Sequence, residues 1–148
     1  MRIHRRSLAV VVVAFAVAGV AAADQKIQAK DLPTAVQKAV QEETRGATIK
    51  GYSKEIEGGK TIYEVETLVN GHSRDLLFDA AGTLVAAEEA TALDAVPGPV
   101  KTALEARGKL LSVETVTKGT RVTYEGIVQK NGRKTEVVVD ADGKPARP

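Results

Sequence analysis

Apolar and polar residues alternate along much of the chain, which is the pattern of β-strands whose two faces differ. From Thr61 to Val69 the alternation places Tyr63 on one face and Glu64 and Glu66 on the other, because successive strand side chains point to opposite sides. Asn70-Gly71 follows, and this dipeptide predicts a tight hairpin because both residues tolerate positive φ. The same reasoning predicts further strands at Thr48–Ile56, Ser73–Asp79, Thr83–Ala87, Leu110–Thr117, Arg121–Gln129 and Arg133–Asp140.

A different spacing of apolar residues predicts one helix ahead of each group of strands. Between Leu32 and Val40 the apolar positions recur three and four residues apart, as on one face of a helix. Asp31 is a suitable N-cap, proline is tolerated in a first helical turn, and Gly46 suits the end. We therefore expect a helix over about Pro33–Arg45. A second apolar set repeats the spacing: Leu93, Val96, Val100, Ala103 and Leu104.

The strand motifs occur twice, so the chain contains an internal duplication. Tyr63-Glu64-Val65 returns as Tyr124-Glu125-Gly126, a shift of 61 positions (from 63 to 124), and Asn70-Gly71 returns as Asn131-Gly132 with the same shift. Such self-similarity indicates a repeated structural unit. We predict an α+β fold of two tandem repeats, each one helix followed by a three- to four-stranded antiparallel sheet. The repeats cover 31–87 and 93–144, with a connector at 88–92 and a tail at 145–148. The short connector favours one continuous assembly, but the sequence leaves open whether the repeats share one sheet.

The N-terminal residues resemble a secretory signal peptide. Three arginines precede an apolar run from Ser7 to Val20, and Ala21-Ala22-Ala23 supplies small residues for cleavage. The apolar run is shorter than the roughly 20 residues that span a bilayer. We expect residues 1–23 to be removed near Ala23, residues 24–30 to form a linker, and the mature protein to be periplasmic or secreted, without membrane attachment.

Composition excludes several function classes. The 21 Lys and Arg residues less the three signal arginines leave 18 against 19 acidic residues, so the mature chain is near −1 and lacks the basic surface of a nucleic-acid-binding protein. The chain has no cysteine, and His72 is the one histidine outside the signal. No base and nucleophile can be paired convincingly, so we predict no enzyme, cofactor or metal centre. Asp140-Ala141-Asp142-Gly143 resembles the start of a calcium loop, but the chain ends before a twelfth-position glutamate, which indicates a turn.

Two kinds of residue are candidates for binding. Tyr63 and Tyr124 are either aromatic anchors on a sheet face or strand residues packed under a helix. The charged residues beside them either line a polar binding face or form the ordinary solvated side of a half-buried sheet. The candidate binding residues are Tyr63, Glu64, Glu66, Arg121, Tyr124 and Glu125.

The helix starts and strand motifs together resemble a known family. Leu32-Pro33-x-x-Val36-x-x-Ala39-Val40 is similar to the opening of PepSY-like domains of exported bacterial proteins, and Val96-Pro97-x-x-Val100-x-x-Ala103-Leu104 repeats it. The Tyr-Glu-Val, Asn-Gly and Phe-Asp-x-x-Gly elements are typical of that family too. The resemblance covers Asp31 to about Lys144. It implies a fold similar to the beta-lactamase inhibitory proteins and an exported, non-enzymatic role; related PepSY domains in protease propeptides are thought to restrain peptidases.

We therefore expect a binding module. Its partner would be another protein, such as a peptidase or an envelope component, held through the antiparallel sheet. The alternative is a small ligand or divalent cation held on the acidic sheet face.

Overall fold

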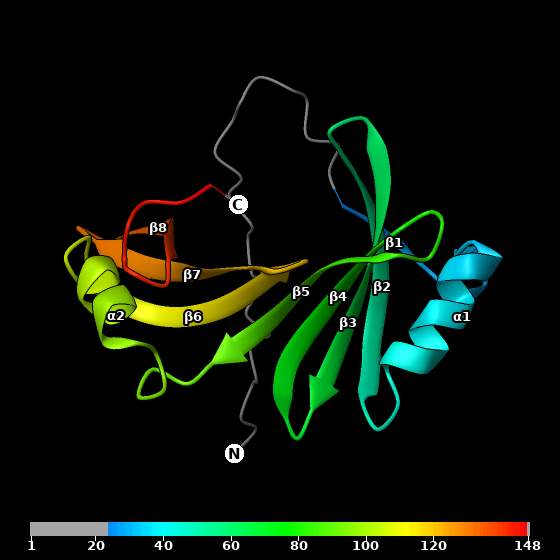
Figure 1. The fold of residues 1–148 in the computed structure, drawn as a ribbon, viewed down its shortest axis with the longest axis horizontal. Coiled ribbons are helices and arrows are strands. Elements are labelled where there is room, and N and C mark those ends of the chain that lie inside the picture. The colour runs from blue at the N-terminus through cyan, green and yellow to red at the C-terminus, as the bar shows by residue number, and fades with distance from the viewer. Residues whose placement is uncertain (1–23, 148) are drawn as a thin grey trace, which may run out of the picture.

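The computed structural model describes residues 24–147, which form one eight-stranded antiparallel sheet and two α-helices (Figure 1). The sheet order is the chain order, β1 to β8. The strands are β1 (Gln25–Ile27), β2 (Thr48–Glu57), β3 (Lys60–Val69), β4 (His72–Asp79), β5 (Leu84–Thr91), β6 (Lys109–Lys118), β7 (Arg121–Lys130) and β8 (Arg133–Asp140). The helices are α1 (Thr34–Glu43) and α2 (Gly98–Glu105), and a short 3₁₀ turn, η1 (Ala29–Asp31), precedes α1. The signal peptide expected over residues 1–23 lies outside the described residues.

The expectation of two tandem helix-plus-sheet repeats is wrong, because all eight strands belong to one sheet. β5 pairs antiparallel with β6, from Ala87 opposite Thr117 to Thr91 opposite Val113. Two separate sheets would each leave an edge strand with unpaired N–H and C=O groups, and pairing β5 with β6 satisfies both edges. The residues expected as a connector, 88–92, lie largely within β5, and part of the expected linker at 24–30 forms β1.

The local predictions of strands and turns are confirmed. The seven predicted strands occur within a few residues of their expected bounds. Asn70 and Gly71 have φ of 51° and 82°, and Asn131 and Gly132 have 51° and 76°, as a two-residue hairpin turn with two positive φ values requires. α1 begins one residue later than expected, with Pro33 at its N-cap and no side-chain cap. Asp31 instead closes η1, where its Oδ2 accepts a hydrogen bond from the N–H of Gln28 (3.0 Å).

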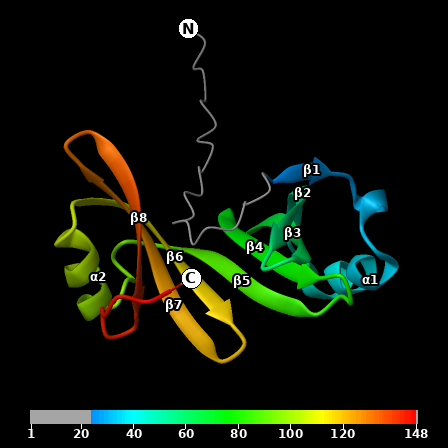
Figure 2. The same cartoon turned by 90° about the horizontal axis from the view of Figure 1, so that it is seen from above.

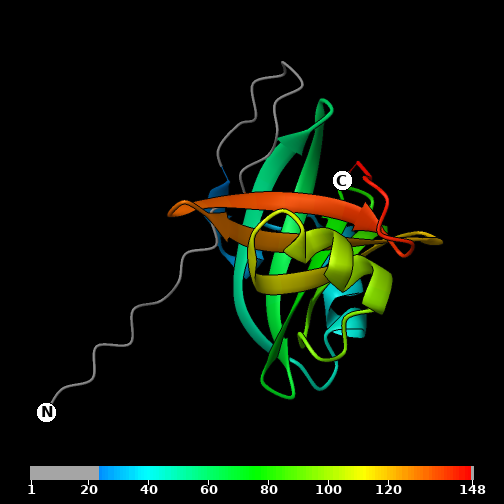
Figure 3. The same ribbon diagram turned by 90° about the vertical axis from the view of Figure 1, so that its left-hand side faces the viewer.

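The sheet is strongly bent, and the helices lie at its two outer ends (Figures 1 and 2). Figure 3 shows β8 running across the direction of β2. Each helix covers a separate apolar cluster. Both clusters lie on the same side of the sheet, which we call the outer side. α1 packs Val36 and Val40 against β3 and β4, including Val65 and Phe78. α2 packs its own apolar residues, Val100 and Leu104, against β6 to β8, including Val113 and Val139.

A third, smaller cluster lies on the opposite side of the sheet. It consists of Ile62, Leu77 and Ala86, with Val85 partly buried against it. Leu77 pairs across the strands with Glu64 and Ala86, so it shares their face. We call this side, which faces away from α1 and α2, the inner face of the sheet.

Candidate functional site

The inner face carries a row of half-buried carboxylates that crosses the sheet. In β3, Val65 packs under α1, so its neighbours Glu64 and Glu66 point to the inner face. The cross-strand register extends this assignment to the other strands. The resulting acidic row comprises Glu55, Glu64, Glu66, Asp75, Glu88, Glu114, Glu125 and Glu136, all half-buried.

Several of these carboxylates stand directly opposite one another. Glu66 pairs with Asp75, and Asp75 pairs with Glu88, on three consecutive strands. Glu114 and Glu125 are paired in the same way on β6 and β7. Opposed side chains in an antiparallel sheet have Cβ atoms about 5 Å apart, and like charges there are destabilising. The sheet therefore holds its acidic side chains in an unfavourable arrangement.

Only part of this charge is compensated within the described chain. Lys26 of β1 forms an ion pair with Glu66. The hydroxyl of Ser53 donates a hydrogen bond to Oε2 of Glu64 (2.9 Å), and the N–H of Thr67 donates to Oδ1 of Asp75 (3.3 Å). Within residues 24–147, the carboxylates of β5 to β8 in this row form no ion pair within 4.0 Å.

Burial and mutual repulsion shift the titration of the row. Burial, followed by the charges of Glu125 and Glu114, raises the pKa of Glu88 to about 8. Burial, then Glu136 and Glu114, raises the pKa of Glu125 to about 7, although Lys118 acts in the opposite direction.

Burial raises the pKa of other carboxyls in the row as well. Burial raises the pKa of Glu55 to about 7, with Asp24 as the next cause. Burial is also the largest cause of the raised pKa values of four further carboxyls: Glu64, Asp75, Glu114 and Glu136. With a pKa of about 8, Glu88 is mostly protonated at neutral pH, so the row is only partly ionised there and is incompletely solvated.

The bend of the sheet makes the inner face concave. Nζ of Lys118 on β6 lies 3.9 Å from Oε1 of Glu57 on β2, and both side chains are on the inner face. Four strand spacings in a flat sheet would separate such residues by about 19 Å. The long side chains can meet because the two halves of the sheet fold toward each other over this face. A concave face brings its carboxylates closer together than a flat one.

The structure divides the six candidate binding residues between two surfaces. Glu64, Glu66 and Glu125 lie in the acidic row, and Arg121 lies on the same face at the end of β7, opposite Lys118. Tyr63 and Tyr124 lie on the outer side, where each packs against the apolar cluster under its helix. The tyrosines and the glutamates therefore do not form one binding surface.

Five of the eight residues of the acidic row were not among the candidate binding residues from the sequence. Asp75 and Glu136 occupy equivalent positions of the two sequence copies, 61 residues apart (from 75 to 136), as do Glu64 and Glu125. Counting alternate positions outward from the Asn-Gly turns would have placed these residues on the face of Glu64. Glu88 gave no such signal, because the strand that carries it was expected to end earlier.

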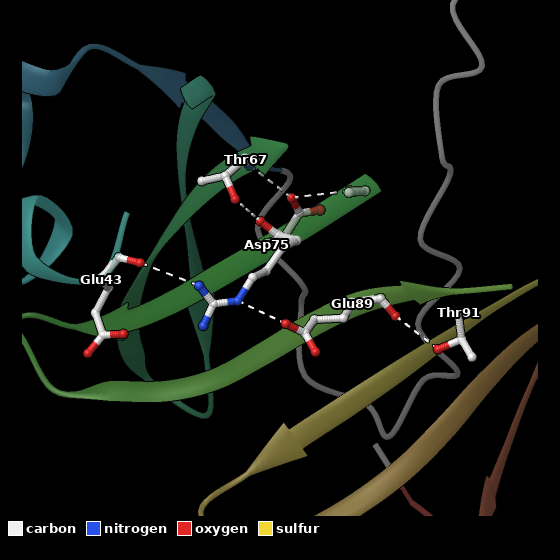
Figure 4. Close-up of polar contacts among 7 residues, drawn as sticks. Glu43, Thr67, Asp75, Glu89 and Thr91 are labelled. Carbon is white, nitrogen blue, oxygen red and sulfur yellow. Dashed lines mark hydrogen bonds and ion pairs between the residues drawn. The ribbon is translucent and has the colours of Figure 1, made fainter. Parts of the chain in front are cut away.

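On the outer side of the sheet, Glu89 has an ion-pair partner, and Figure 4 shows its surroundings. Nε of Arg74 on β4 lies 2.9 Å from Oε1 of Glu89 on β5. Nη1 of Arg74 donates a hydrogen bond to the carbonyl oxygen of Glu43, the last residue of α1 (3.4 Å). Arg74 thereby ties the end of α1 to two strands, and Glu89 has a partner that its inner-face neighbour Glu88 lacks.

The described residues contain neither a cluster of metal-holding side chains nor a membrane-spanning helix. Between residues 24 and 147, no group of three or more His, Asp and Glu side chains is arranged to hold a metal ion. In the same part of the chain, no helix has the length and apolar character of a membrane span. His72 is exposed at the start of β4, next to the hairpin turn.

Solved structures of bacterial proteins share this fold. One is a protein from Bacteroides eggerthii that is described as periplasmic on a provisional basis. It has a TM-score of 0.64 at 21% identity, and the match covers 78% of this chain and 86% of that one. A DUF2874 family protein from Bacteroides ovatus has a TM-score of 0.62 at 17% identity and covers 78% of this chain and 85% of that one. A BLIP-like protein from Bacteroides fragilis has a TM-score of 0.59 at 19% identity, and the match covers 78% of this chain and 84% of that one.

These likenesses establish the fold and not the activity. The expected similarity to the beta-lactamase inhibitory proteins is confirmed at the level of the fold. No protein-family model matches the chain, and no curated protein sequence matches it. Membership of the PepSY-like family stays a prediction.

Proposed function

We propose that the protein is an exported, non-enzymatic module that binds another protein through the inner face of its sheet. The observation that carries the proposal is the acidic row, in which Glu66, Asp75 and Glu88 stand in register on three adjacent strands. A partner that places lysine or arginine side chains against this row would relieve the repulsion and replace lost hydration with charge-assisted hydrogen bonds. The partner surface is therefore basic and convex.

The comparisons support the exported part of this proposal. The Bacteroides eggerthii protein that shares this fold has been assigned provisionally to the periplasm. In addition, the N-terminal sequence has the composition of a signal peptide. The non-enzymatic part rests on the residue inventory, which offers one histidine outside that segment and no cysteine. A peptidase or an envelope component with a basic surface fits as the partner.

Affinity capture with matched variants tests the proposal. The mature protein, starting at Asp24, is immobilised and exposed to envelope extract of its source, and retained proteins are identified by mass spectrometry. The variant Glu64→Gln/Glu125→Gln removes two carboxyl groups from the acidic row. Its control, Glu43→Gln/Glu89→Gln, removes two carboxyl groups from the outer side, so the two variants lose the same number of carboxyl groups.

The expected result is a saturable, basic partner that the inner-face variant retains at least about tenfold less well, since two charge-assisted contacts are lost. The outer-side variant should retain it as the wild type does. Retention should also weaken as salt is raised, because the contacts are ionic. A partner lost equally from both variants, or from neither, contradicts binding through the inner face.

A further inference from the structure

At one end of the inner face an apolar cluster interrupts the acidic row, and lysine side chains stand among the carboxylates there. There the Ile62, Leu77 and Ala86 cluster forms the floor of an open cavity of about 390 Å³ between the β2–β3 turn and the neighbouring ends of β5 and β6. The floor side chains are almost fully buried, with exposed fractions of 3% to 8%. The cavity reaches the lower part of the 300–1,000 Å³ range typical of small-molecule sites.

The rim of this cavity collects cationic side chains. Lys60 and Lys118 line it, and Arg121 stands opposite Lys118 on the next strand. Four carboxylates border the floor or the rim. Glu57 pairs with Lys118 at 3.9 Å, and Asp79 has a pKa that is lowered first by the backbone N–H of Thr83 and in smaller part by Lys60. Glu55 and Glu64 of the acidic row stand opposite the floor residues Ile62 and Leu77. The Glu57 side chain is 60% exposed, so its ion pair with Lys118 is weak and open to competition.

We propose that this cavity binds a free, monomeric medium-chain carboxylate, with the alkyl chain on the apolar floor and the carboxylate between Lys60 and Lys118. The two parts of such a ligand match the two parts of the site: burial of the chain removes apolar surface from water, and the lysines supply the opposite charge. The acidic row along the rest of the inner face would repel the carboxylate, which fixes the head group at the basic rim. This proposal is independent of the protein partner.

The site lies where the two sequence copies meet and has no equivalent in the second copy. Lys60 and Glu57 correspond to Arg121 and Lys118, each 61 positions later (from 60 to 121, from 57 to 118). The first copy therefore supplies Lys60 to the rim, and the second supplies Lys118. The position equivalent to Ile62 in the second copy holds Thr123, so an apolar floor residue is replaced by a polar one. In the described sheet β8 is an edge strand, so no strand lies beyond it to complete an equivalent floor.

Chemical-shift titration of the ¹⁵N-labelled mature protein tests the proposal, with octanoate, decanoate, decanol and decylammonium kept below their micellar concentrations. We expect decanoate to shift the amides of Ile62, Leu77 and Ala86 in a saturable way. Decanoate should bind up to about fifteenfold more tightly than octanoate, since each buried CH₂ contributes about fourfold. Decylammonium should bind more weakly than decanoate.

Two variants separate charge recognition from unspecific apolar binding. Lys60→Gln/Lys118→Gln should weaken decanoate by about fivefold and leave decanol unchanged, whereas Glu57→Gln should tighten decanoate about twofold to fivefold by freeing Lys118. Glu89→Gln on the outer side is the control and should change neither. All four replaced side chains are at least partly exposed, so the fold should persist, and the amide spectra check this directly.

Three results would overturn the proposal: shifts centred on other parts of the sheet, equal binding of decylammonium and decanoate, or binding that appears only with micelles. A lack of any effect of Glu57→Gln together with unchanged binding in the double lysine variant would also exclude the basic rim as the recognition element. Failure of this site would leave the acidic row, and the protein partner proposed for it, unaffected.

Discussion

Glu88 lies in the middle of the acidic row, and replacing it with glutamine isolates the free-energy cost of its charge. Asp75 stands opposite it on β4, and Val116 stands opposite it on β6. Glutamine has nearly the same size and shape as glutamate, so the substitution changes charge without opening a cavity. We expect Glu88→Gln to increase the free energy of unfolding at alkaline pH.

The direction follows from proton linkage. The pKa of Glu88 is about 8 in the folded protein, against 4.5 for a glutamate side chain free of such effects. Between these values the folded state holds a proton that the unfolded state releases, so stability falls as pH rises from about 4.5 to about 8. The contribution is fully present below pH 4.5 and lost above pH 8. Glutamine cannot ionise and avoids this loss.

The size of the effect can be bounded. Each pKa unit corresponds to about 1.36 kcal/mol, so the full shift sets a ceiling of about 5 kcal/mol. Water entry and rearrangement screen half-buried charges strongly, with an effective dielectric constant near 20. We therefore expect the stabilisation by Glu88→Gln to be about 2 kcal/mol larger at pH 9 than at pH 5.

Urea unfolding followed by circular dichroism at pH 5, 7 and 9 measures this, since the chain has no tryptophan. The matched control is Glu89→Gln, one residue along β5 on the outer side, where the side chain pairs with Arg74. Loss of that exposed ion pair should cost at most ~1 kcal/mol, a change of opposite sign to that of Glu88→Gln at pH 9. An equal effect of Glu88→Gln at pH 5 and pH 9, or a wild type more stable at pH 9 than at pH 5, would refute the reasoning.

Two glycines that touch a helix give further predictions. Gly82→Ala should cost about 1–3 kcal/mol more than Gly59→Ala, because both have positive φ (83° and 78°) but only at Gly82 would the new Cβ meet backbone, the carbonyl oxygen of Ala35 at 2.6 Å. Thermal unfolding of the two variants compares them, and equal losses would show that φ alone sets the cost. Gly126→Ala should cost about 1–3 kcal/mol, because its Cβ would lie 2.7 Å from Cδ1 of buried Leu104; an unchanged midpoint in urea would contradict this close packing of α2.

Local features of the fold could be predicted from the sequence, and the pairing of distant edges could not. The Asn70-Gly71 turn forms because both residues tolerate positive φ, a preference that does not depend on distant parts of the chain. The alternation of apolar and polar residues likewise identifies the two faces of the preceding strand. The junction between β5 and β6 depends instead on which edges remain unsatisfied once the other hairpins form. Thr91 and Thr115, whose hydroxyl oxygens lie 2.6 Å apart across this junction, are unremarkable in sequence because neither residue signals a partner 24 positions away.

The candidate site shows the same division. Glu64 and Glu66 could be assigned to the polar face from the sequence, but whether that face was ordinary solvated surface depended on the curvature and register of the whole sheet. The tyrosines next to the glutamates were attractive as anchors, yet alternation alone already sends Tyr63 to the side opposite Glu64. The acidic row proposed as the binding site is made of carboxylates from strands that the sequence could not bring together.

The contrast between adjacent residues on β5 is the strongest argument that the inner face is kept for binding. Glu89 points outward and meets Arg74 at 2.9 Å, so this sheet can neutralise a glutamate where it is of use to the fold. Glu88 points inward to a row of other carboxyls. Burial and the neighbouring charges raise its pKa to about 8, so ionising Glu88 in the folded protein costs free energy. A glutamine or threonine in its place would relieve that cost without changing the strand. Charges that destabilise a fold and have a simple remedy are typical of sites where a partner, and not the fold, supplies the compensation.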